Sequence, residues 1–144
     1  MFRCAALGLL ALTLLSTAQA QVPRLFPAHA LRGEITGTAP PDVLLNGRPA
    51  RLAPGARIRN QENRFDLISQ IAGQKLVVNY TLEAGGMLLE IWILTPSEQA
   101  NRPWPATREQ AQTWTFDPIA QAWTRPGTRR HRPRSFSSAP SAAR

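Results

Sequence analysis

The chain has 144 residues, of which 17 are basic and 9 acidic, and its single cysteine is Cys4. Cys4 precedes the hydrophobic run at the N-terminus, so no cysteine follows that run. The chain after it therefore cannot form disulfides, thiol nucleophiles, iron–sulfur clusters or cysteine zinc sites. The basic excess is concentrated in residues 125–144, which hold six arginines and no acid, whereas residues 21–124 are nearly neutral and long enough for one small domain.

The N-terminus has the pattern of a secretory signal peptide. Arg3 supplies a positive charge, residues 5–15 form an apolar run, and Ala18 and Ala20 form an A-x-A cleavage site. The run is shorter than the roughly 20 apolar residues that a membrane span needs. We therefore expect cleavage before Gln21 and a periplasmic or secreted product without a transmembrane segment; an uncleaved anchor is the alternative.

The first predicted strand covers residues 31–37. Leu31, Gly33 and Ile35 alternate with polar residues and would share one face. The following Ala39-Pro40-Pro41-Asp42 predicts a turn.

The run DVLLNGRPARL predicts a β-hairpin. Asn46 and Gly47 both tolerate positive φ, as a two-residue type I′ turn requires. Pro54-Gly55 predicts another turn, followed by a short strand over residues 56–59.

The segment ENRFDLISQIAG predicts a short helix or an irregular turn. Phe65, Ile68 and Ile71 follow helical spacing, and Gly73 is suited to end a helix.

Two further strands are expected over residues 75–82 and 87–94, joined by a turn at residues 83–86. The first strand alternates apolar and polar side chains, whereas the second is apolar on both faces, with Leu88 and Trp92 on the face opposite Ile91 and Ile93. Since neither face of such a strand is suited to water, another part of the chain should cover Trp92.

The covering segment is predicted to be residues 95–124. Thr95 to Glu98 forms a capping box with a proline at the first helical position, and Thr107 to Gln110 repeats it more weakly. The run TWTFDPIAQAWTR then predicts a hairpin that turns near Asp117-Pro118 and buries Trp114, Phe116 and Trp123.

Residues 30–94 resemble a group of small OB-like β-barrel domains of unknown function found in exported bacterial proteins. The resemblance implies a barrel that serves as a binding or scaffold module, and it implies no particular activity. The matching residues are Gly33, Ile35, Asn46-Gly47, Gly55-Ala56, Ile58, Gly73 and Leu76 to Val78.

These observations predict a mainly β protein: a small OB-like β-barrel with a short helix, a C-terminal Trp-containing hairpin and a disordered tail. The expected division is 1–20 signal peptide, 21–29 lead-in, 30–94 barrel, 95–124 short helices and hairpin on the barrel, and 125–144 basic tail.

No catalytic motif stands out, so we expect a protein that is not an enzyme and has no cofactor or metal. His29 and His131 are isolated and make poor metal ligands. Glu62 and Asp66 are four residues apart and would be the carboxylate pair of a weak hydrolase or enzyme accessory protein. The alternative is an ion-pair cluster between these acids and Arg57, Arg59 and Arg64 on the protein surface.

Trp104 is the best candidate for an exposed platform that stacks on a sugar ring, because it lies in the proline-rich run RPWPAT. A carbohydrate or cell-wall binder is therefore one alternative function. The competing interpretation is that the tryptophans form a second core.

The tail contains too little apolar surface to fold. Its candidate role is an electrostatic tether to an anionic envelope surface, either lipopolysaccharide or lipid, and the alternative is an extension without function. A nucleic-acid partner is not expected, because the body is nearly neutral and the signal peptide directs the chain out of the cytoplasm. The candidate surface contacts are Arg125, Arg129, Arg130, Arg132 and Arg134.

Overall fold

The structure is a computed structural model that describes residues 23–128. The predicted cleavage site and most of the predicted tail contacts lie outside the described residues: Ala18, Ala20, Gln21, Arg129, Arg130, Arg132 and Arg134.

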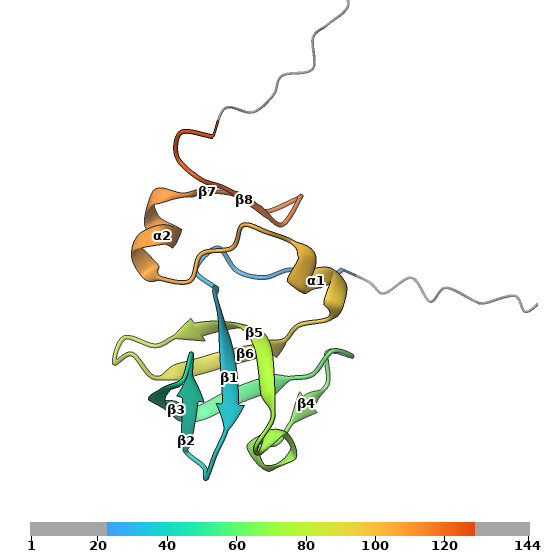
Figure 1. The fold of residues 1–144 in the computed structure, drawn as a ribbon, viewed down its shortest axis with the longest axis vertical. Helices are drawn as coiled ribbons and strands as arrows, with labels where there is room; N and C mark the ends of the chain where they lie inside the picture. Colours follow the sequence, from blue (N-terminus) through green and yellow to red (C-terminus); the bar gives the residue numbers. More distant parts are fainter. Residues whose placement is uncertain (1–22, 129–144) are drawn as a thin grey trace, which may run out of the picture.

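Five strands close into a small barrel (Figure 1). The barrel strands are β1 (Leu31–Gly37), β2 (Asp42–Leu45), β3 (Arg48–Arg59), β5 (Lys75–Leu82) and β6 (Leu88–Ile93).

The strand order makes the barrel OB-like. β1 pairs with β2 and β5, β5 with β6, and β6 with β3, while the β2–β3 pairing closes the sheet. The β3–β6 pairing is parallel and the other barrel pairings are antiparallel. Numbered along the chain, the barrel strands therefore follow the order 1-2-3-5-4, which confirms the predicted small OB-like barrel and shows that it has five strands.

The hairpin between β2 and β3 is the predicted two-residue turn. Asn46 and Gly47 have φ of 53° and 76°, and Leu45 pairs with Arg48 across the turn. The Asn46 Oδ1 also accepts the backbone N–H of Glu34 at 2.8 Å, which ties the turn to β1. Local turn chemistry thus sets the register of the first three strands.

The turn predicted at Pro54-Gly55 is wrong. β3 runs unbroken through these residues, with Gly55 at φ 80°, and only its pairing with β6 is interrupted, between Leu52 and Arg57. The glycine lets the strand bend, so that its first half pairs with β2 and its second half with β6.

The two faces predicted for β6 are wrong in its first half, because the strand contains a bulge. Tyr80 pairs with Ile91 and Leu82 with Leu88, so β6 holds one residue more than β5 over this stretch. The extra residue reverses the alternation, and Leu88 points into the barrel together with Ile91 instead of away from it. Leu89 is left exposed.

The weakly predicted helix is a 3-10 helix, η1 (Ile68–Ile71), and the two-residue strand β4 (Phe65–Asp66) precedes it. Ile71 is buried, whereas Phe65 is exposed. η1 packs so closely on β1 that a Cβ at Gly37 would lie 2.7 Å from the carbonyl oxygen of Ile71. This close contact requires glycine at the end of β1.

The barrel interior is a continuous apolar core drawn from all five barrel strands and η1. Its buried members are Leu31, Ile35, Val43, Ile58, Ile71, Val78, Tyr80, Leu88, Ile91 and Ile93.

Residues 94–124 form a cap over one side of the barrel (Figure 1). Both predicted capping boxes start helices at Thr95 and Thr107, although in the second only the Thr107 half of the box is present. The cap elements are α1 (Pro96–Ala100), α2 (Arg108–Thr113), β7 (Thr115–Asp117) and β8 (Ala122–Thr124).

A second core lies between the barrel and the cap, as the apolar outer face of β6 predicted. Trp92 is covered by Phe26 of the lead-in, with ring centroids 5.8 Å apart. The lead-in therefore belongs to this core, which the sequence alone did not suggest. Its buried members are Phe26, Ala30, Leu94, Trp104 and Trp123, with Val77, Trp92, Ala111, Trp114 and Phe116 packed against them.

Candidate functional site

Trp104 is not the exposed platform that the sequence suggested. Its side chain is 7% exposed, its Nε1 donates to the carbonyl of Ala30 at 3.0 Å, and its ring packs against Phe26 and Trp123. Proline-rich flanks pointed to a surface loop, but the segment folds inward because the outer face of β6 needs an apolar cover. In this fold the indole presents no open face to a sugar ring.

The Glu62 and Asp66 carboxylates do not share a helical face. Glu62 lies in a turn, and Asp66 lies in β4, where its Oδ1 accepts the Asn60 side-chain N–H at 3.0 Å. The ion pairs of Arg57 and Arg59 are made instead with Glu90, at 3.4 and 3.8 Å. The predicted cluster of these arginines with Glu62 and Asp66 is therefore wrong, and Arg57 and Arg59 pair with an acid of β6 instead.

Over residues 23–128, no group of three or more His, Cys, Asp or Glu side chains is placed to hold a metal ion. The same residues contain no helix that is both long and apolar enough to cross a membrane. His131 lies outside the described residues.

Arg125 lies in a concentration of positive charge that the sequence did not reveal. Arg102 and Arg125 are both exposed and line the same two neighbouring hollows, of about 510 and 330 Å³. The guanidinium of Arg125 stacks over the Trp114 ring at 5.1 Å, which positions it on the cap. Neither arginine forms an ion pair within residues 23–128.

Arg32 forms the floor of this region, and we call Arg32, Arg102 and Arg125 the arginine surface. The Arg32 guanidinium donates to the carbonyl of Asn101 at 2.7 Å and stacks over Trp104 at 4.8 Å. Burial, and then the positive charge of Arg102, lower the pKa of Arg32 to about 10. The group stays charged at neutral pH, and the negative charge of Glu98 offsets only part of the repulsion from Arg102, so a bound anion would relieve the remainder.

The acid that lines the smaller hollow does not pair with these arginines. Glu34 lines the smaller hollow, but its carboxylate pairs with Lys75 on the neighbouring strand at 3.3 Å. The arginine surface is therefore chemically suited to accept carboxylate, phosphate or sulfate groups.

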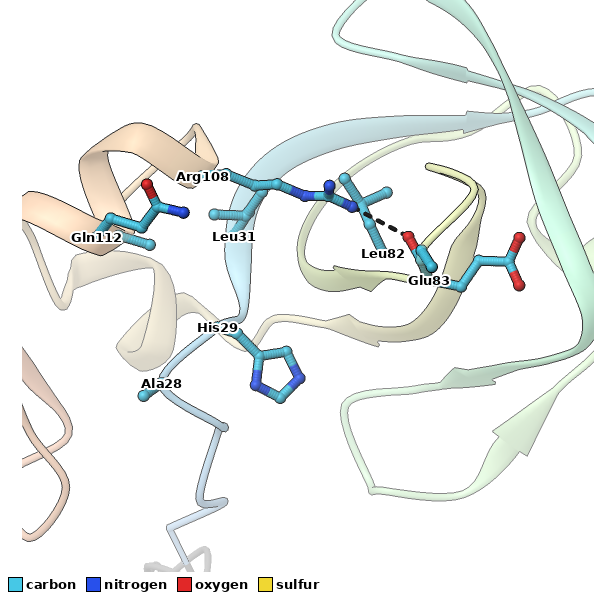
Figure 2. Close-up of a pocket in the computed structure, with 9 residues that line it drawn as sticks. Ala28, His29, Leu31, Leu82, Glu83, Arg108 and Gln112 are labelled. Atoms are coloured by element: carbon cyan, nitrogen blue, oxygen red, sulfur yellow. Dashed lines mark hydrogen bonds between the residues drawn. The ribbon is translucent and has the colours of Figure 1, made fainter.

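A second concave region, which we call the seam pocket, lies between the barrel and the cap (Figure 2). Its volume is about 410 Å³, and it is bounded by the lead-in, the β5–β6 turn and α2. Arg108 of α2 reaches across it and donates to the carbonyl of Glu83 at 3.0 Å.

Comparison with known proteins gives no relative for this chain. No protein-family model, curated protein or solved structure matches it significantly.

Sequence reasoning named Arg125 but missed Arg32, Arg102 and Arg108. Arg32 occupies an ordinary polar position in the alternating pattern of β1, so nothing in the sequence singles it out. Arg102 and Arg108 lie in short cap segments that are far from Arg125 in the chain. Only the packing of the cap on the barrel brings them to common surfaces, and no local pattern could have indicated it.

Proposed function

We propose that this chain is an exported, non-enzymatic binding module that attaches to an anionic envelope surface through its arginine surface and basic C-terminal segment. The observation that supports this most directly is the pair Arg102 and Arg125, which line common hollows without an acidic partner among the described residues. The sequence continues from Thr128 into Arg129, Arg130, Arg132 and Arg134, so the arginine surface extends the charge of the tail onto the folded protein.

Export rests on the N-terminal sequence and on the resemblance to exported OB-like domains. The A-x-A site at Ala18 and Ala20 favours release before Gln21. Absence of cysteine after Cys4 is compatible with an oxidising compartment such as the periplasm. N-terminal sequencing of the protein recovered from the periplasmic fraction tests this part: a chain that starts at Met1 would contradict it.

Binding to an anionic surface is tested by sedimentation with vesicles that contain lipopolysaccharide or anionic phospholipid, over a series of salt concentrations. Each basic residue near such a surface contributes on the order of 1 kcal/mol at low salt. The Arg102→Gln/Arg125→Gln variant should therefore lose about thirtyfold in affinity, since its two lost contributions sum to about 2 kcal/mol. A variant with glutamine at 129, 130, 132 and 134 should lose more.

The matched control is Arg48→Gln/Arg64→Gln, which removes the same charge from exposed positions on β3 and the β3–β4 turn. Equal losses in both double variants would show that only net charge matters and would refute a defined surface. Binding that does not weaken as salt rises would refute the electrostatic mechanism.

A further inference from the structure

We infer that the seam pocket is a binding site for a small organic acid, with Arg108 as the residue that holds its carboxylate. This goes beyond attachment to an envelope surface, because the pocket lies apart from the arginine surface and shares no lining residue with it. The volume of about 410 Å³ falls in the usual range for small-molecule pockets.

The cation in this pocket is held by a hydrogen bond and forms no ion pair among the described residues. One N–H of Arg108 is fixed by the carbonyl of Glu83 at 3.0 Å, and no ion pair to Arg108 is present within residues 23–128. An arginine side chain has five N–H donors, so most of them remain for a ligand.

Neither neighbouring carboxylate forms an ion pair with Arg108 within residues 23–128. Figure 2 shows the Glu83 side chain extending away from the Arg108 guanidinium, and its Oε1 lies 2.9 Å from the position that a Cβ on Gly85 would take. The Glu109 carboxylate bonds to its own backbone N–H and to Thr107, and these contacts lower its pKa. The charge of Arg108 also lowers the pKa of Glu109, but less than these hydrogen bonds do, and neither acid forms an ion pair with Arg108.

The rest of the pocket favours an acid with an apolar body. Leu31, Leu82 and Ala111 supply apolar surface, and Leu31 is 3% exposed, so this floor is part of the packed barrel. Figure 2 shows Arg108 along one side of the pocket and the His29 ring on the other. A planar carboxylate matches the fork of a guanidinium, and a short alkyl or aryl group would cover the leucines.

The test titrates the purified full chain with hexanoate, with its uncharged counterpart hexanol and with inorganic phosphate, and follows the leucine methyl signals by NMR. Hexanoate should give saturable shifts at Leu31 and Leu82. Arg108→Gln should weaken hexanoate binding by about tenfold or more, because a charged hydrogen bond is lost. Arg64→Gln, which removes the same charge from an exposed position on the β3–β4 turn, should leave it unchanged.

Because Arg108 also links α2 to the β5–β6 turn, a second variant keeps the test decisive. Gln112→Tyr adds bulk at an exposed rim position and should block binding without altering the thermal unfolding midpoint. Hexanol that binds as tightly as hexanoate would overturn the role of Arg108, and phosphate that binds as tightly would overturn the assignment to an organic acid. Hexanoate binding that survives both Arg108→Gln and Gln112→Tyr would place the site elsewhere.

Discussion

Trp104 illustrates how one buried side chain combines packing with a hydrogen bond. Its Nε1 donates to the carbonyl of Ala30, which is itself fully buried, and its ring packs edge-on against Phe26 and Trp123. The cap, the lead-in and β1 therefore meet at this residue.

Replacing Trp104 by phenylalanine should lower the free energy of unfolding by about 1–3 kcal/mol, since the carbonyl of Ala30 would lose its donor. Trp104→Ala should cost more, about 3–5 kcal/mol, because it also opens a cavity. Urea unfolding of the three proteins measures both effects. A neutral Trp104→Phe would mean that the hydrogen bond contributes nothing to stability.

Glu98 is an acid held by several hydrogen bonds. Arg24 donates to both of its carboxylate oxygens and also to the carbonyls of Asn60 and Ile93, both at 2.7 Å. Burial opposes ionisation of Glu98, but the hydrogen bonds from Arg24 and Thr95 outweigh it and hold the pKa of the carboxyl below its usual value.

The lowered pKa makes this contribution dependent on pH. A carboxyl whose pKa is depressed by folding stabilises the protein above the unfolded value, near 4.5, and this stabilisation is lost as pH falls through the folded pKa. Glu98→Gln should therefore cost about 1–3 kcal/mol at neutral pH and progressively less below pH 4.5. Unfolding free energies measured at on the order of ten pH values between pH 2 and 7 would show this dependence of the cost on pH. Glu62→Gln, at an exposed position, is the control. A cost that does not change with pH would contradict the assignment.

The bulge in β6 is the element that sets which side chains fill the barrel. The backbone N–H of Glu90, displaced from the ladder, donates to the hydroxyl of Thr81 at 3.2 Å, and Thr81 is 4% exposed. A buried hydroxyl on β5 thus satisfies the backbone group that the bulge releases.

Thr81→Val keeps the shape of the side chain but removes the acceptor. We expect a loss of about 1–2 kcal/mol in the free energy of unfolding and faster hydrogen exchange at the Glu90 amide. Native-state exchange followed by NMR gives the site-specific result. Unchanged exchange at Glu90 would show that Thr81 does not support the bulge, even if the variant were less stable.

At the scale of the whole molecule, the barrel and the cap share the second core and should therefore unfold together. Trp92 belongs to β6, whereas Trp104, Trp114 and Trp123 belong to the cap, and all four lie in the second core. The lead-in adds Phe26 from the other end of the described chain and closes this core.

We therefore predict that urea transitions followed by tryptophan fluorescence and by far-ultraviolet circular dichroism coincide. Phe26→Ala should shift both midpoints together and lower the unfolding free energy by about 3–5 kcal/mol. A fluorescence transition that precedes the loss of β-structure would show that the cap opens independently of the barrel.

The local elements could be predicted because their causes are local. The strands over residues 31–37 and 75–82, the Asn46-Gly47 turn and the Thr95 capping box each depend on a few adjacent residues, and each is present where expected. The order of these elements, with its resemblance to OB-like domains, was sufficient for the fold class.

Only the tertiary structure decided barrel closure, the inward position of Leu88, the burial of Trp104 and the gathering of arginines on the cap. The parallel pairing of β3 with β6 joins segments that are distant in the chain, and it requires both the bend at Gly55 and the bulge opposite Thr81. Burial of Trp104 depends on what covers it, and the grouping of Arg102 with Arg125 depends on how the cap packs. These features arise from contacts between segments that are distant in the chain, so they could not be predicted from patterns of neighbouring residues.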